Sequence, residues 1–255
     1  MTIKIIVLIL LVALVTACIS GIFGMAGGLI FMGVIASFMG VAEAMVVHGA
    51  VQGVSNSYRA YLLRGHVRWD IFGKIVVGAV PALALLFLLR YVPSKGVLFM
   101  VLGLLPVLLW LPKGWISLDA QKPAHAIFCG FCVTGLNLVA GVAGPALDMF
   151  FVKTQMPRHE IVATKAIIMF TSHIMKILYF GIPLLMRAKL SGQVSGLPPW
   201  WFFIAAVPLI ILGTFTGTRI LGHMSNVGFR STTKYLVSVV GVFYVFRGAV
   251  FLGWI

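Results

Sequence analysis

Apolar residues are arranged in long stretches that recur from one end of the chain to the other. A helix needs roughly 20 such residues to cross the hydrocarbon layer of a bilayer. Because lipid cannot satisfy backbone N–H and C=O groups, each stretch is predicted to be helical. The predicted segments are 3–38, 43–63, 71–90, 95–111, 123–153, 160–186, 200–221 and 231–254.

Two of these segments, 3–38 and 123–153, are longer than one ordinary crossing, and glycines interrupt both. Each is either a kinked span or a hairpin that returns to the side it left. If both segments are kinked spans, six of the loop lysines and arginines lie on one side of the membrane and seven on the other. If both are hairpins, nine lie on one side and four on the other. Because positive loops stay in the cytoplasm, the uneven division favours hairpins, a cytoplasmic nine-residue side and periplasmic termini.

The second half of the chain repeats the first. A shift of 117 positions aligns residues 24–59 with 141–176, so that the two glycine breaks coincide and a glutamate opens each following helix. Each half then has one hairpin and three crossings, an odd number, which turns the second half upside down. Inverted repeats are the usual architecture of alternating-access carriers. The sequence therefore predicts an all-α polytopic membrane protein of two inverted repeats, 1–118 and 119–255.

The composition argues against a water-soluble globule. With 61% hydrophobic residues, 9% charged residues and five acidic side chains, the chain lacks the polar surface that water requires. The net charge of +14 comes from lysines and arginines dispersed between apolar segments, which suits interfacial anchoring and not nucleic-acid binding. The first apolar stretch continues too far for a signal peptide. We expect a multi-pass protein of the bacterial inner membrane, surrounded by the lipid bilayer.

One face of the segment 43–63 is polar. Residues spaced by four, three and four positions fall on one stripe of a helix. The stripe holds His48, Gln52, Ser55 and Arg59, with Asn56 beside it. The matching stripe of 160–186 holds Lys165, Met169, Ser172 and Lys176, with His173 beside it. Ionisable side chains inside a bilayer normally mark a solute path, and stripes with cations but no carboxylate indicate an anion.

Each of these features also has a structural interpretation. Arg59 and Lys176 are close enough to a helix end to reach the headgroups, and Lys165, five residues from Glu160, could reach the opposite interface. Glycines at the breaks also suit close helix packing. Alternatively, the unwound turns offer free N–H groups at new helix N-termini, which favour an anion. Asp148 is expected to cap the half-helix after the second break or to hold a nearby lysine.

The break motifs resemble those of a known family. They are Gly-x-x-Gly-x-Ala-Gly-Gly at 21–28, Gly-x-x-Gly-Pro at 141–145 and Ala-Thr-Lys-Ala at 163–166. Together they are similar to the sulfite exporter family TauE/SafE over the full chain. The resemblance implies a secondary carrier that moves sulfite, sulfoacetate and other organic anions across the inner membrane, mostly outward. It also implies pore-facing turns that contain Gly24, Gly27, Gly28, Gly141, Gly144 and Pro145.

The sequence therefore predicts a non-enzymatic transporter of a small anion, such as sulfite, a sulfonate or a carboxylate, without a metal or cofactor. The anion would be held by backbone N–H groups, the stripe hydroxyls and the cations, and the two stripe histidines are candidate titrating groups. Met25 and Ala26 depart from the family pattern, so the identity of the substrate is left open. Whether the protein forms a homodimer is also left open. Two alternatives are a thiol–disulfide conduit that uses Cys18 with Cys129 or Cys132, and a non-transporting assembly subunit.

Overall fold

The computed structural model describes residues 1–23, 25–111, 118–191, 196–223 and 226–255. These residues form ten α-helices and two short 3-10 helices, and they contain no strand. The α-helices are α1 (Ile3–Phe23), α2 (Met25–Phe38), α3 (Val41–Leu62), α4 (Trp69–Leu88), α5 (Lys95–Leu104), α6 (Pro123–Ala140), α7 (Gly144–Phe151), α8 (Arg158–Ser191), α9 (Trp200–Gly222) and α10 (Asn226–Leu252). The 3-10 helices are η1 (Arg64–His66) and η2 (Leu105–Trp110). The all-α prediction is confirmed.

Six helices are long and apolar enough to cross a membrane, namely α1, α4, α6, α8, α9 and α10. Their outer faces expose large apolar side chains such as Phe87, Ile204 and Val242, as contact with lipid requires. The helix α3 has 22 residues, but its polar stripe makes it less apolar than these six. The protein is therefore a multi-pass membrane protein, with α3 distinguished by a polar face that is buried.

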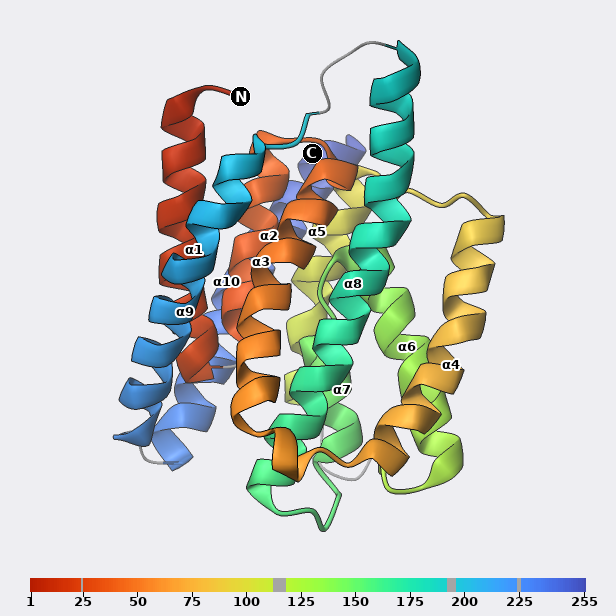
Figure 1. Ribbon diagram of the computed structural model, residues 1–255, viewed down its shortest axis with the longest axis vertical. Coiled ribbons are helices and arrows are strands. Elements are labelled where there is room, and N and C mark those ends of the chain that lie inside the picture. Colours follow the sequence, from red (N-terminus) through yellow and green to blue (C-terminus); the bar gives the residue numbers. More distant parts are fainter. Residues whose placement is uncertain (24, 112–117, 192–195, 224–225) are drawn as a thin grey trace.

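The helix breaks fall where the glycines predict them, between α1 and α2 and between α6 and α7. In Figure 1, α2 runs back beside α1 towards the end of the molecule that holds the N-terminus, and α6 and α7 make a similar excursion from the opposite end. The base of the second excursion is closed by hydrogen bonds from Ala120 N to Phe150 O and from Gln155 N to Gln121 Oε1, each 2.8 Å long. The two chain termini lie at the same end of the molecule (Figure 1).

Helices from the first half of the chain pack in pairs with helices from the second half. The helix α1 lies along α9, α4 along α6, α3 across α8 and α5 along α10. Small residues allow the closest approaches. A Cβ atom at Gly130 of α6 would overlap the carbonyl oxygen of Ile75 in α4, and one at Gly217 of α9 would overlap that of Cys18 in α1. Such contacts hold membrane helices together where no hydrophobic force acts between them.

Gly130→Leu is expected to separate α4 from α6, because the added side chain would meet backbone atoms that cannot rotate away. Overpacking of this kind costs about 1–3 kcal/mol, which lowers the thermal unfolding midpoint by roughly 3–10 °C. The midpoint is measured on protein extracted in mild detergent. Gly135→Leu is the matched control on the same helix, since nothing lies within 4 Å of a Cβ there. Equal midpoints for the two variants would contradict this packing.

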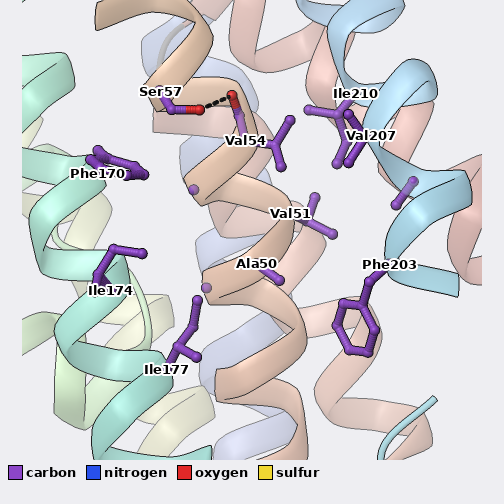
Figure 2. A pocket seen from close by; sticks show the side chains of 13 residues that line it. Ala50, Val51, Val54, Ser57, Phe170, Ile174, Ile177, Phe203, Val207 and Ile210 are labelled. Carbon is purple, nitrogen blue, oxygen red and sulfur yellow. Dashed lines mark hydrogen bonds between the residues drawn. The ribbon is translucent and has the colours of Figure 1, made fainter. Parts of the chain in front are cut away.

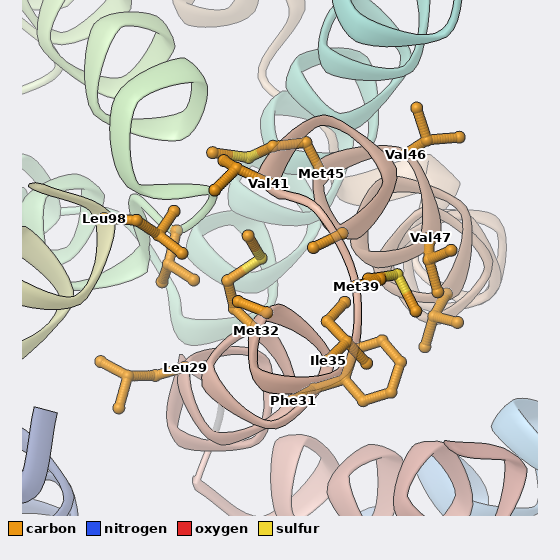
Figure 3. Packing of buried hydrophobic residues seen from close by; sticks show 14 of the residues in the cluster. Leu29, Phe31, Met32, Ile35, Met39, Val41, Met45, Val46, Val47 and Leu98 are labelled. Carbon is orange, nitrogen blue, oxygen red and sulfur yellow. The ribbon is translucent and has the colours of Figure 1, made fainter. Parts of the chain in front are cut away.

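The short helices beside both breaks are buried in the protein. The helix α2 packs against α3 and α5 through a cluster that contains Leu29, Phe31, Met32, Ile35, Met45, Val47 and Leu98 (Figure 3). The helix α7 packs against α4, α6 and α8 in a second cluster that contains Leu147 and Phe150. Helix ends are tolerated at membrane depth where protein shields them from lipid, and these clusters provide that shielding.

Most predicted bounds agree with the structure to within a few residues. The helix α8 continues through Pro183 to Ser191, beyond its predicted end at 186, and α10 begins at Asn226, ahead of its predicted start at 231. The predicted helix 95–111 changes from α5 into η2 part of the way along. The predicted linker at 112–114 lies outside the described residues.

Candidate functional site

Lys176 of α8 is the most deeply buried charged side chain among the described residues, with no exposed surface. Its Nζ contacts Gly141 O at 2.8 Å, Asn137 Oδ1 at 3.1 Å and His48 Nδ1 at 2.8 Å. These partners belong to the second break, to α6 and to α3. All five acidic side chains of the chain are described, and none of them forms an ion pair with Lys176. The lysine therefore has neutral acceptors around it and no countercharge.

His48 connects this lysine to the first break. Its Nε2 contacts Gly28 O in α2 at 3.0 Å, while its Nδ1 faces Lys176. The carbonyls of Gly28 and Gly141 are thus backbone groups that contact the two stripes, and they hold the donors of His48 and Lys176 in place. The expected contact of backbone N–H groups at the breaks with the anion stays a prediction.

Further polar side chains surround this pair. Asn137 Nδ2 donates to Ser172 Oγ at 2.7 Å, and the His173 ring centroid lies 5.5 Å from that of His48. His173 Nδ1 is buried and has no hydrogen-bond partner among the described residues. Gln52 is 6% exposed and lies against Gly28. We call these residues the polar cluster, and its members are His48, Gln52, Asn137, Ser172, His173 and Lys176.

Arg59 lies outside the polar cluster, closer to the other end of α3. It is three helical turns from His48, roughly 16 Å along the helix axis. Its Nη2 donates to Ser20 O at 3.4 Å, and the buried Ser20 Oγ has no hydrogen-bond partner in the part of the chain that the structure describes. Ser55, between the two levels, shares a 2.9 Å hydrogen bond with Thr214 of α9. The predicted stripe on α3 therefore faces the interior along its whole length.

Asn56 and Lys165 are placed apart from the polar cluster. Asn56 is half-buried, and its Nδ2 donates to the Gln52 carbonyl of its own helix at 2.9 Å. Lys165 forms an ion pair with Asp148 of α7, in which both side chains are partly exposed. The structure therefore bears out the interpretation that Asp148 holds a nearby lysine. It also leaves Lys165 with a countercharge that Lys176 lacks.

Asp148→Asn is expected to destabilise the protein, because it leaves the partly buried Lys165 ammonium without a countercharge. We expect a loss of about 1 kcal/mol, or a fall of roughly 2–4 °C in the unfolding midpoint. The double variant Asp148→Asn with Lys165→Gln removes both charges and should recover most of this loss. A midpoint for Asp148→Asn equal to that of the native protein would show that the ion pair contributes no stability.

The glycines at the breaks have different roles. Gly141 ends α6 with φ at 73°, a left-handed conformation that favours glycine. Gly144 begins α7, and Pro145 follows in its first turn, as expected. A Cβ at Gly27 would overlap Thr16 O, so this glycine allows α1 and α2 to pack closely. Close helix packing was the structural interpretation of the glycines at the breaks. Gly24 lies outside the described residues.

The glutamates that open α3 and α8 lie in the first helical turns, as predicted. The Glu43 carboxylate lies against Gly40, the residue that precedes α3. Glu160 accepts a hydrogen bond from Arg68 Nη1 at 3.4 Å, and Thr164 Oγ1 accepts one from Arg68 N at 3.0 Å. Hydrogen bonds to the Asp70 carboxylate raise the pKa of the Arg68 guanidinium above its ordinary value. Arg68 therefore fastens the connection between α3 and α4 to the start of α8.

One cavity lies away from the polar cluster. A groove of about 290 Å³ opens between α3, α8 and α9, and apolar side chains such as Val54, Ile174 and Val207 line it (Figure 2). It lies on the face of α3 opposite to the polar stripe, so it does not suit a small anion. A narrow space of about 10 Å³ between α4, α6 and α8 is lined in part by Thr134 and Ser172. This second space reaches the edge of the polar cluster.

Asn137 and Thr214 contact predicted site residues but were missed by the sequence interpretation. Each lies in a strongly apolar helix with few other polar residues, such as Thr134 in α6 and Thr218 in α9. The repeat contained a signal for Asn137, because the same shift of 117 positions relates it to Ser20, the partner of Arg59. Cys129 is buried in the apolar cluster around Leu147, and the three cysteines are unpaired.

A helical bundle with six possible membrane spans and polar side chains buried at two helix breaks defines a polytopic membrane protein whose interior suits a polar solute. Residues 9–244 match the family model of the sulfite exporter TauE/SafE. The chain therefore belongs to this family, a family of transporters, and the resemblance of the break motifs is confirmed. No curated protein and no solved structure matched the chain.

Proposed function

We propose that the protein is a secondary carrier that moves a small anion, such as sulfite or an organosulfonate, out of the cytoplasm across the bacterial inner membrane by alternating access. The observation that carries this proposal is the buried Lys176, which has three neutral acceptors and no acidic partner. A buried charge without a countercharge is costly in a bilayer, and a negative solute removes that cost. Membership of the TauE/SafE family supports the same class of substrate.

The inverted repeat of 1–118 and 119–255 is part of this proposal, and equivalent contacts support it. Arg59 contacts Ser20, and the residues 117 positions later, Lys176 and Asn137, also contact each other. Likewise, the Phe31 ring stacks on His48, and the equivalent residues Asp148 and Lys165 form an ion pair. The pairing of α1 with α9 is matched by that of α6 with α4. Opposite helix directions in the two halves are also what Figure 1 suggests.

The antiparallel crossing of α3 and α8 arranges the candidate residues in levels. Lys176 and His48 are at one level. Arg59 of α3 and Lys165 of α8 are at a second level, three helical turns or roughly 16 Å away along the helix axes. Hydroxyl and amide groups of Gln52, Ser55 and Ser172 lie between. An anion would pass from one cationic level to the other, with charge-assisted hydrogen bonds offsetting its lost hydration.

Alternating access requires one half to move against the other at the crossing of α3 and α8. Gly49 and Gly53 of α3 face His173 and Ile177 of α8 there, so small residues form the contact surface. The Arg68–Glu160 contact fastens the connection that follows α3 to the start of α8. We propose that this end of the molecule, which gathers most of the loop cations, faces the cytoplasm and that the termini are periplasmic.

A thermal-shift screen of the purified protein tests the proposal. The panel contains sulfite, sulfate, thiosulfate, taurine, sulfoacetate and small carboxylates, each at matched ionic strength, with choline chloride as the control salt. At a ligand concentration 100 times its Kd, binding adds about 2.7 kcal/mol to the stability of the folded state. We expect at least one sulfur oxyanion to raise the unfolding midpoint by several degrees. A panel in which no anion exceeds the control would contradict anion binding.

A further inference from the structure

The contacts between Lys176 and His48 define where protons can lie in the polar cluster. A carbonyl oxygen can only accept, so the 3.0 Å contact with Gly28 O makes His48 Nε2 a donor. In a neutral ring, Nδ1 is then an acceptor and receives a hydrogen bond from Lys176 Nζ at 2.8 Å. Asn137 Oδ1 and Gly141 O are the other two acceptors of Nζ. Three acceptors match the three N–H bonds of an ammonium group.

The same positions of the heavy atoms also accommodate the proton on His48. If it moves across the 2.8 Å contact from Nζ to Nδ1, the imidazolium donates to the neutral amine and to Gly28 O. The amine still donates to Asn137 and Gly141. If the proton leaves altogether, only two N–H bonds remain for three acceptors, and one acceptor is unsatisfied. The pair is therefore built to bind one proton and then carries one positive charge.

The surroundings of the pair contain nothing that neutralises this charge. The other titratable group that faces it is His173 of α8, with a ring centroid 5.5 Å from that of His48. The elements packed around the pair contribute Gly28 and Phe31 from α2, Asn137 from α6 and Gly141 from the second break, all uncharged. No described acid forms an ion pair with either residue.

We infer that Lys176 and His48 form a proton-binding site that couples the proton to the transported anion. This inference rests on the proposed function. The anion and the proton enter the cluster together, because each offsets the charge of the other, and both leave before the empty carrier returns. Neither the loaded nor the empty protein then moves a net charge across the bilayer. Outward transport by this mechanism requires an anion gradient that exceeds the inward proton gradient.

Proteoliposomes that contain a pH-sensitive dye test the coupling. Methanesulfonate is the probe, because it is a fully ionised monovalent anion near neutral pH and carries no proton itself. An inward methanesulfonate gradient should acidify the lumen by about one proton per anion, after subtraction of protein-free vesicles. An imposed potassium diffusion potential should leave the accumulation ratio unchanged. Anion flux without proton movement would overturn the coupling alone, whereas no flux of any anion would overturn the proposed function and the coupling with it.

His48→Gln keeps a hydrogen-bonding side chain at this position but removes the titrating ring. We expect its proton-to-anion ratio to fall towards zero and its accumulation ratio to depend on the potential. His159→Gln is the control, since His159 is exposed in the first turn of α8, 17 residues before Lys176, and its ratio should stay at about one. Equal ratios in the two variants would overturn the assignment to His48.

If the His48→Gln variant no longer transports the anion, a binding measurement tests the inference in place of the flux measurement. Calorimetric titration with methanesulfonate in two buffers of different ionisation enthalpy gives the number of protons taken up on binding. The native protein and His159→Gln should take up about one proton per anion, and His48→Gln should take up none. Anion binding to the native protein without proton uptake would overturn the inference.

Discussion

Lys176→Met is expected to remove most of the stabilisation that anions give to the protein. The substitution keeps the length and apolar stem of the side chain but removes the ammonium group that would meet the anion. Hydrogen bonds to charged groups contribute about 1.5–3 kcal/mol, so we expect the apparent affinity to fall roughly 10- to 150-fold. The shift in unfolding midpoint as a function of anion concentration measures this change.

Lys189→Met is the matched control for this variant. It removes a lysine from the same helix, but Lys189 is exposed in the last turn of α8. Its anion affinity should equal that of the native protein. Lys176→Arg should recover part of the affinity, because it keeps the charge but not the compact three-donor geometry. Native affinity in Lys176→Met would show that the buried cation does not bind the anion.

Gly141→Ala is expected to destabilise the protein strongly, because it adds a methyl group to a residue in the left-handed conformation that also has close neighbours. A non-glycine residue in the left-handed conformation costs about 1–2 kcal/mol, and the new Cβ would lie 2.8 Å from Met32 Sδ and 3.1 Å from Met45 Sδ. Together we expect a loss of about 2–4 kcal/mol, seen as a fall of roughly 5–15 °C in the unfolding midpoint.

Gly253→Ala separates the two contributions to this loss. Gly253 also has φ at 73°, but nothing lies within 4 Å of a Cβ there. It should therefore show the cost of the backbone conformation without the steric contact, reduced further by its position near the chain terminus. A smaller fall for Gly141→Ala than for Gly253→Ala would mean that the packing of the second break against α2 and α3 is wrong.

The sequence was sufficient to predict the helices, both breaks and the polar stripe of α3. Their signals are local, because apolar length, glycine clusters and helical spacing can each be recognised within one segment. The glycines at 141 and 144 were correctly placed at helix ends for the same reason. Lys176 was also among the candidates, since a cation in a long apolar segment has few uses.

Contacts between segments could not be predicted in the same way. Lys165 and Lys176 belong to one predicted stripe, yet Asp148 neutralises the first and no acid neutralises the second. That difference depends on how α7 packs against α8. Asn137 lies in an apolar helix, and its contacts with Lys176 and Ser172 join segments that are far apart in the sequence. The contacts of the Gly28 and Gly141 carbonyls with His48 and Lys176 likewise follow from the tertiary fold.

Counterflow of radiolabelled sulfite in proteoliposomes tests the central claim most directly, because it asks whether the chain alone moves the anion. Vesicles preloaded with unlabelled sulfite are diluted into a trace of labelled sulfite, and labelled sulfoacetate is tested in the same way. We predict transient, saturable accumulation of label with the native protein and much slower accumulation with Lys176→Met. Accumulation no faster than in protein-free vesicles, for both anions, would contradict the account.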